Sequence, residues 1–298
     1  DVVQLLPGPG ESVGAALVAD GRLGGVAFTG STETARRINR TLAERDGPIV
    51  PLIAETGGQN AMIVDSSALP EQVTRDVLIS AFQSAGQRCS ALRVMFVQDE
   101  IADGLSEMIA GAMDELRLGD PGLLSTDVGP VIDGDAKTLL EDHAAKMDKQ
   151  GKLIRAATLG SGCEHGTFFA PRAYWIKDLG QLEREVFGPV LHMIRWKHAD
   201  LDKVIAQING AGYGLTCGVH TRVDSFAQYV TSRVRAGNCY VNRNMIGAIV
   251  GSQPFGGEGL SGTGPKAGGP RYLHRFAVER VVSTDVTAAG GNTALMTL

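Results

Sequence analysis

The 298-residue sequence has few cysteines, no long apolar run and no excess of basic charge. Its cysteines show no CxxC spacing, which argues against a disulfide framework or a zinc site. No segment approaches the roughly 18 apolar residues of a membrane-spanning helix, and no signal peptide precedes the first predicted strand. We therefore expect no metal site and a reduced, cytoplasmic protein. The four cysteines are Cys89, Cys163, Cys217 and Cys239.

Charge and hydrophobicity indicate which partners and what size of core to expect. The formal net charge is −5, with acidic and basic residues interspersed. Because phosphate backbones are bound by basic surfaces, we expect no nucleic-acid partner. A hydrophobic content of 43% is enough for the core of one large domain or two ordinary ones.

Strand-like and helix-like segments alternate along most of the chain, which predicts an α/β fold with a largely parallel sheet. Predicted helices cover residues 32–44, 71–85, 101–116, 134–150, 201–209 and 225–235. Predicted strands cover residues 25–28, 48–54, 61–64, 93–97, 153–158, 168–176, 190–196, 215–220, 238–242 and 275–284.

The chain begins without an initiator Met, in an apolar stretch punctuated by proline and glycine, DVVQLLPGPG. We interpret this start as the middle of a domain and the chain as an N-terminally truncated fragment. An incomplete domain leaves core-forming side chains uncovered, so we expect exposed apolar surface near residues 1–30.

Cys89 lies in the loop GQRCSA, between a predicted helix and a predicted strand. With Gly86 and Arg88 close in sequence, such a cysteine can be a thiolate nucleophile with a lowered pKa. Taken alone, it is more often a buried structural thiol.

Two further loops carry polar residues at the ends of predicted strands. Glu55, in ETGGQN, can act as a general base for water, although a single glutamate there more often forms a salt bridge or a cap. Ser31, in FTGSTE, lies where a strand leads into a helix, an arrangement that holds pyrophosphates. The GxGxxG pattern is missing, and Ser31 can equally be a plain N-cap.

Six segments in order resemble the aldehyde dehydrogenase superfamily over essentially the whole chain: FTGS, ExGG, GQxCSA, ExFGPV, GNxxVN and QPFGG. Thr56 departs from the pattern, since many members carry Leu there. The resemblance implies an α/β, aldehyde dehydrogenase-like fold. Its expected parts are an incomplete Rossmann-like NAD-binding domain (1–56), a catalytic domain (57–245), and a segment (246–298) with a substrate-anchor loop, a return to the NAD-binding domain and an oligomerisation flap.

The resemblance also implies the chemistry. Cys89 would attack the aldehyde, hydride would leave to NAD, and Glu55 would activate the water that releases the acid. The backbone N–H of Cys89 would form half of an oxyanion hole. The other half, in the family, is an Asn side chain from a region upstream of Asp1.

The cofactor contacts follow from the same resemblance. Gly30 and Ser31 would approach the pyrophosphate, Glu185 would bond the nicotinamide ribose, and Phe187 would pack on the nicotinamide face. For Phe187, ordinary core packing is the alternative. The family's adenosine-binding strand lies upstream, so this sequence does not distinguish NAD from NADP; we expect NAD.

The stretch 246–273 resembles the glutamate γ-semialdehyde (1-pyrroline-5-carboxylate) dehydrogenases, most closely the C-terminal module of bifunctional proline utilization A proteins. The tail TDVTAAGGNTALMTL fits this subgroup. By this resemblance, the backbone amides of Gly247 and Ala248 and the Ser90 hydroxyl bind the substrate's α-carboxylate, and Phe255 packs on its aliphatic stem. Arg88 adds charge or forms a structural salt bridge. A loop without a ligand role is the alternative for residues 247–251.

The expected activity is thus NAD-dependent oxidation of L-glutamate γ-semialdehyde to L-glutamate, the second step of proline catabolism. The resemblance also implies a proline dehydrogenase domain in the same full-length polypeptide and a homodimer or larger assembly. A dehydrogenase for another small aldehyde, and a catalytically silent fragment that serves as an oligomerisation module, are the alternatives.

Overall fold

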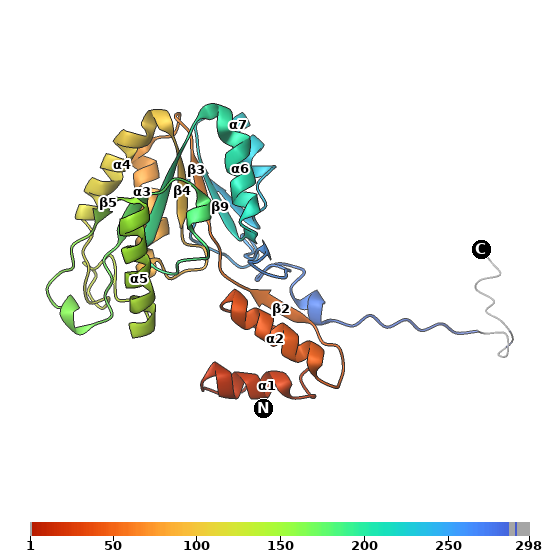
Figure 1. The fold of residues 1–298 in the computed structure, drawn as a ribbon. Helices are drawn as coiled ribbons and strands as arrows, with labels where there is room; N and C mark the ends of the chain where they lie inside the picture. The colour runs from red at the N-terminus through yellow and green to blue at the C-terminus, as the bar shows by residue number, and fades with distance from the viewer. Residues whose placement is uncertain (1, 286–289, 291–298) are drawn as a thin grey trace.

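A seven-stranded sheet forms the centre of the computed structural model, which describes residues 2–285 and 290 (Figure 1). The strand order is β10-β9-β3-β4-β7-β6-β5, and every neighbouring pair is parallel except β5–β6. The prediction of an α/β fold with a largely parallel sheet is confirmed. The strands are Asn238–Val241 (β10), Thr216–His220 (β9), Ala61–Val64 (β3), Val94–Gln98 (β4), Val190–Trp196 (β7), Arg172–Trp175 (β6) and Lys152–Ala156 (β5).

Helices lie on both sides of this sheet (Figure 1). Because both faces are covered, the central strand β4 is almost entirely apolar: the four side chains from Val94 to Val97 are all fully buried. The predicted helix at 71–85 ends early, at Phe82, where the chain turns sharply. The helices are Pro70–Phe82 (α3), Asp99–Asp114 (α4), Gly134–Gln150 (α5), Leu201–Gly210 (α6) and Asp224–Thr231 (α7).

A smaller unit precedes the large sheet in sequence and lies at one end of it (Figure 1). It contains a parallel pair, Val26–Thr29 (β1) and Leu52–Glu55 (β2), linked by Thr32–Glu44 (α2). The short helices Gly10–Gly14 (η1) and Ala15–Ala19 (α1) come before it.

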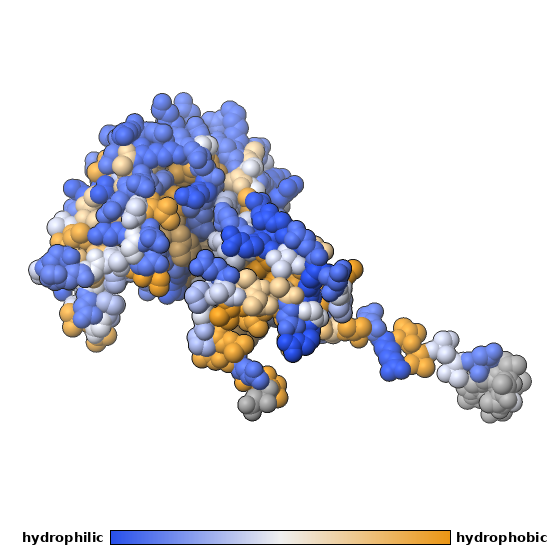
Figure 2. Space-filling view, turned by 60° about the horizontal axis from the view of Figure 1, so that its bottom comes forward, coloured by the Kyte–Doolittle hydropathy of each residue, from blue (hydrophilic) through white to orange (hydrophobic). Residues whose placement is uncertain are grey.

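Apolar side chains near the chain start are exposed. Val2 is fully exposed and Leu5 is 88% exposed. Figure 2 shows hydrophobic surface on this part of the molecule. The expectation of exposed apolar surface near residues 1–30 is confirmed.

The C-terminal segment returns from the large sheet to the small one. Glu258–Gly259 (β11) pairs antiparallel with Tyr213–Gly214 (β8). The predicted strand at 275–284 is wrong: Leu273–Phe276 form a short 3-10 helix (η6), and residues 277–285 form no strand. They run outward from the body (Figure 1), and among the described residues no backbone lies beside them to complete a strand's hydrogen bonds. Most of the tail in 284–298 lies outside the described residues.

The remaining regular segments are single 3-10 turns at Gln83–Gly86 (η2), Cys163–His165 (η3), Leu179–Gln181 (η4) and His198–Asp200 (η5). Within the described part of the chain, no helix is both long and apolar enough to cross a membrane. The same residues contain no group of three or more His, Cys, Asp or Glu side chains arranged to hold a metal ion.

Candidate active site

A cavity of about 1110 Å³ opens between the small unit, α5 and the loops at the edge of the large sheet. Segments far apart in sequence meet there, at the ends of β1 and β2, before β4, before β7 and after β10. Every residue to which the sequence analysis gave a site role lines this cavity. They are Gly30, Ser31, Glu55, Arg88, Cys89, Ser90, Glu185, Phe187, Gly247, Ala248 and Phe255.

The loop that carries Cys89 begins with a left-handed turn. Ser84, Ala85 and Gly86 have φ values of 55°, 52° and 62°. For residues with a Cβ this conformation costs roughly 1–2 kcal/mol each. Gly86 has a second constraint, because a Cβ there would lie 2.3 Å from the carbonyl oxygen of Gly188. The turn redirects the chain from α3 into β4 and places Cys89 at the cavity.

Asn60 fixes the main chain on both sides of the nucleophile. Its side-chain amide is almost fully buried and donates to the carbonyls of Cys89, at 2.6 Å, and Ala91, at 2.8 Å. Its oxygen accepts from the backbone N–H of Thr216, at 3.2 Å. The position of Cys89 is therefore set by the side chain of Asn60, which directly precedes β3, as well as by the conformation of its own loop.

The thiol of Cys89 does not have the lowered pKa that the sequence predicted. Burial raises its pKa, and the carboxylates of Glu185 and Glu55 add to the rise, while the backbone amides of Ser90 and Cys89 oppose it. Arg88 does not reverse this effect, because its side chain is exposed and donates to the Ser84 hydroxyl at 2.9 Å. Arg88 forms no salt bridge with any described residue, so that alternative is wrong.

Glu55 ends β2 and points its carboxylate into the site. It is 8% exposed, and neither carboxylate oxygen has a hydrogen bond of normal geometry among the described residues, although the Gly257 amide lies close enough to act on the carboxylate. Burial raises the pKa of Glu55 to about 7, against the opposing effects of the Gly257 amide and the Lys266 charge. A salt-bridged or capping role is therefore wrong. A carboxylate that exchanges its proton near neutral pH is suited to general-base work.

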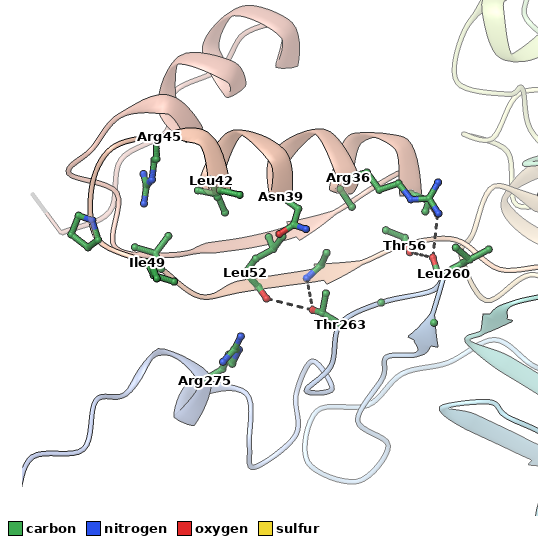
Figure 3. A pocket seen from close by; sticks show the side chains of 18 of the residues that line it. Arg36, Asn39, Leu42, Arg45, Ile49, Leu52, Thr56, Leu260, Thr263 and Arg275 are labelled. Carbon is green, nitrogen blue, oxygen red and sulfur yellow. Dashed lines mark hydrogen bonds between the residues drawn. The ribbon is translucent and has the colours of Figure 1, made fainter.

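The strand that carries Glu55 is held from the C-terminal segment (Figure 3). The Thr263 hydroxyl accepts from the N–H of Ala54 at 2.9 Å, and the Thr56 hydroxyl donates to the Leu260 carbonyl at 2.5 Å. The departure at Thr56 thus supplies a hydrogen bond that Leu would lack. Figure 3 also shows a second cavity, of about 670 Å³, between α2 and this segment, away from Cys89.

Glu185 and Phe187 line the cavity from the segment that precedes β7. A Cβ on Gly57 would stand 1.6 Å from a carboxylate oxygen of Glu185, so a larger residue there would force that carboxylate to move. Burial raises the pKa of Glu185, while Arg93 lowers it. Phe187 is 44% exposed, so core packing does not explain it.

Ser31 is the N-cap of α2, as one of its two interpretations proposed. Its hydroxyl accepts from the N–H of Thr34 at 3.1 Å. Gly30, Ser31 and Thr32 all line the cavity, so the positive end of the α2 dipole opens onto it. The cap and an anion-binding helix end are compatible.

The loop at Gly247 and Ala248 offers unpaired amides. Neither backbone N–H donates to an acceptor among the described residues, whereas the Gly247 carbonyl accepts from the Tyr240 hydroxyl at 3.3 Å. Gly247 has φ 128°, which favours glycine. Phe255 is fixed beside them by two backbone hydrogen bonds with Ala267, at 2.9 and 2.8 Å. Two free amides in one loop form a concavity suited to a carboxylate.

Sequence reasoning missed three polar residues behind the cavity. Asn60 and Arg93 lie in apolar surroundings at the starts of β3 and β4, and Arg243 donates to the Ile246 carbonyl at 3.3 Å, under the 247–248 loop. A charged residue at the start of an otherwise apolar strand, as in ALRVMFV, was the available signal for Arg93.

Comparison with known proteins bears on this geometry. The sequence profile described as "Aldehyde dehydrogenase family" matches residues 1–282. "Bifunctional protein PutA" of Escherichia coli (strain K12) is 57% identical over 287 residues, which cover 94% of this chain and 22% of that protein. The "1-pyrroline-5-carboxylate dehydrogenase" of Geobacillus sp. (strain WCH70) is 35% identical, covering 95% of this chain and 55% of that protein.

Solved structures agree. A crystal structure of bifunctional proline utilization A (PutA) superposes with a TM-score of 0.90 at 57% identity, covering 95% of this chain and 28% of that one. A 1-pyrroline-5-carboxylate dehydrogenase from Thermus, with bound NAD, superposes with a TM-score of 0.85 at 33% identity, covering 91% and 52%. The chain thus spans about a fifth of the length of the PutA relatives and about half that of the separate dehydrogenases.

Proposed function

Because the chain belongs to the aldehyde dehydrogenase family, we propose that it carries the catalytic machinery of an NAD-dependent dehydrogenase that oxidises L-glutamate γ-semialdehyde to L-glutamate. The observation that carries the proposal is the shared cavity. A nucleophile (Cys89), an unpartnered carboxylate (Glu55) and the free amides of Gly247 and Ala248 all line it.

The residues divide the reaction into two halves. The Cys89 thiol loses its proton to water and the thiolate attacks the aldehyde carbon, and the backbone N–H of Cys89 would stabilise the resulting oxyanion. As the carbonyl re-forms, a hydride leaves the carbon and a thioester remains on Cys89. Glu55 then takes a proton from water, the hydroxide attacks the thioester carbon, and the thiolate of Cys89 leaves. The net change is oxidation of an aldehyde to an acid, with one hydride removed.

The cavity fits the cofactor that this chemistry requires. NAD⁺, when bound, supplies the hydride acceptor. The cavity's 1110 Å³ exceeds the roughly 300–1,000 Å³ of drug-sized ligand sites, which leaves room for a dinucleotide and an aldehyde. Gly30 and Ser31 at the α2 N-terminus would hold the pyrophosphate, the Glu185 carboxylate would bond a ribose, and the exposed ring of Phe187 would face the nicotinamide.

The part of the cavity around the 247–248 loop fits a short aldehyde that carries a carboxylate. The amides of Gly247 and Ala248, with the Ser90 hydroxyl, would hold the α-carboxylate, and Phe255 would cover the aliphatic stem. Relatives named 1-pyrroline-5-carboxylate dehydrogenase support this substrate class. The bifunctional PutA relatives support a place as the second step of proline catabolism, with a proline dehydrogenase domain in the same polypeptide and a homodimer or larger assembly.

The test compares two aldehydes on the native polypeptide that contains residues 1–298. We expect NAD⁺ reduction with a kcat/KM for L-glutamate γ-semialdehyde at least roughly tenfold above that for propanal, because charge-assisted hydrogen bonds to the carboxylate contribute about 1.5–3 kcal/mol. A polypeptide that oxidises propanal but not the semialdehyde would refute the substrate assignment and favour another small aldehyde.

A further inference from the structure

Arg93 is a fully buried cation whose partners all belong to the site. It lies between the Cys89 loop and the first residue of β4, and it is 1% exposed. One guanidinium nitrogen donates to the carbonyls of Gly86, at 2.6 Å, and Gly188, at 3.1 Å. The other donates to the carbonyl of Arg88, at 3.0 Å, and to the Glu185 carboxylate, at 3.3 Å.

These contacts join two segments that are far apart in sequence. Gly86 ends the left-handed turn and Arg88 directly precedes Cys89. Glu185 and Gly188 belong to the segment before β7, and the guanidinium carbon lies 5.1 Å from the centre of the Phe187 ring of that same segment. The planar fork of an arginine can bond several carbonyls and a carboxylate at once, which a lysine ammonium at the same place cannot do.

Burying such a charge is costly. Removing a cation from water costs several kcal/mol, and well-packed apolar residues often replace buried ion pairs without loss of stability. The Nε of Arg93 has no partner among the described residues, so the pairing is not complete. Stability alone therefore does not account for an arginine here, whereas its contacts with both halves of the site do.

We propose that Arg93 is a positioning residue that locks the Cys89 loop and the Glu185–Phe187 segment into one geometry, so that nucleophile and cofactor contacts are set together. The inference rests on the proposed function for the roles of Cys89 and Glu185. Among the described side chains, only that of Arg93 hydrogen-bonds to both the Cys89 loop and the Glu185–Phe187 segment.

A pair of histidines, His143 and His192, is hydrogen-bonded to the backbone carbonyl of Arg93. Nδ1 of His192 lies 3.0 Å from the Arg93 carbonyl, and since a carbonyl only accepts, Nδ1 carries the proton. Nε2 of His192 then accepts from Nε2 of His143, at 2.9 Å. Burial lowers the pKa of His192 to about 3 and that of His143 to about 4, so both rings are neutral at pH 7 and add no charge beside the guanidinium.

The experiment uses the native polypeptide that contains residues 1–298, with Arg93→Lys, Arg93→Gln and the matched control Arg45→Lys. Arg45 also bonds backbone carbonyls, those of Asp20 at 2.7 Å and Leu23 at 3.1 Å, but lies outside the Cys89 cavity. Two readouts need no turnover: the Kd for NAD⁺, and the rate of alkylation of Cys89 by iodoacetamide across pH, measured on the Cys89 peptide by mass spectrometry.

We expect Arg93→Lys to weaken NAD⁺ binding roughly 10- to 100-fold, the effect of losing a charge-assisted hydrogen bond to Glu185. The positive charge of Arg93 interacts favourably with the Cys89 thiolate. Because Lys keeps that charge, its alkylation profile should stay near that of the parent, whereas in Arg93→Gln the profile should move to higher pH. If Arg93→Gln does not fold, the Lys variant alone decides. Unchanged NAD⁺ affinity in Arg93→Lys, or an equal loss in Arg45→Lys, would overturn the proposal.

These readouts also separate this inference from the proposed function. If the parent binds NAD⁺ but ignores the semialdehyde, the substrate assignment fails and the Arg93 comparison stands. If the parent does not bind NAD⁺, the proposed function fails, and the alkylation profile of Arg93→Gln alone decides: an unshifted profile overturns the positioning role.

Discussion

Replacing Glu55 by glutamine should change stability in a way that depends on pH. Burial raises the pKa of Glu55 from its ordinary 4.5 to about 7. Between these values the folded state holds a proton that the unfolded chain has released, so the carboxyl group makes the protein less stable as pH rises through this window. At 1.36 kcal/mol per pH unit, the full cost above pH 7 is about 3 kcal/mol.

Glutamine has nearly the same shape and no charge, so Glu55→Gln avoids this cost. We expect the variant to be more stable than the parent by up to about 3 kcal/mol at pH 8.5, and by less than about 1 kcal/mol at pH 5. With an unfolding entropy of about 2.1 cal/mol/K per residue, 298 residues convert 3 kcal/mol into a rise in Tm of roughly 5 °C.

Thermal unfolding followed by circular dichroism at the two pH values measures this difference. The matched control is Glu183→Gln, because Glu183 is exposed and its bond to Lys146 lowers its pKa, which predicts no gain at high pH. Equal Tm differences for Glu55→Gln at pH 5 and pH 8.5 would refute the assignment of an uncompensated carboxylate to this position.

The remaining predictions concern the site directly. Cys89→Ala should abolish semialdehyde oxidation while NAD⁺ still binds; activity within tenfold of the parent would exclude Cys89 as the nucleophile. Gly57→Ala should weaken NAD⁺ binding at least roughly tenfold, because its Cβ falls 1.6 Å from a Glu185 oxygen, whereas Gly104→Ala, where a Cβ meets nothing within 4 Å, should not. Ser90→Ala should raise KM for the semialdehyde roughly tenfold and leave KM for propanal unchanged; equal changes would contradict a carboxylate contact.

Patterns that depend on neighbours in sequence predicted the fold well. The period of apolar residues located most helices and all seven strands of the large sheet, since most of these elements bury one or both faces. The strand predicted at 275–284 failed because a strand is stable only beside another backbone, and this cannot be read from the segment itself.

In the site, too, the sequence predicted local features but not those that depend on contacts between distant segments. Cys89 and Glu55 stood in recognisable loops, and both line the cavity. The raised pKa of Cys89 could not be predicted, because it is the sum of burial and two carboxylates brought from distant segments. Asn60 and Arg93 were missed for a similar reason: their importance lies in carbonyls that only the folded chain brings within reach.

A covalent intermediate on Cys89 tests the central claim most directly. The native polypeptide containing residues 1–298, with Glu55→Gln to stop hydrolysis, would be mixed with NAD⁺ and L-glutamate γ-semialdehyde, quenched with acid and digested for mass spectrometry. We expect the Cys89 peptide to gain the mass of one glutamyl acyl group, and only when NAD⁺ is present. An unmodified Cys89 peptide, or the acyl group on another residue, would contradict the account.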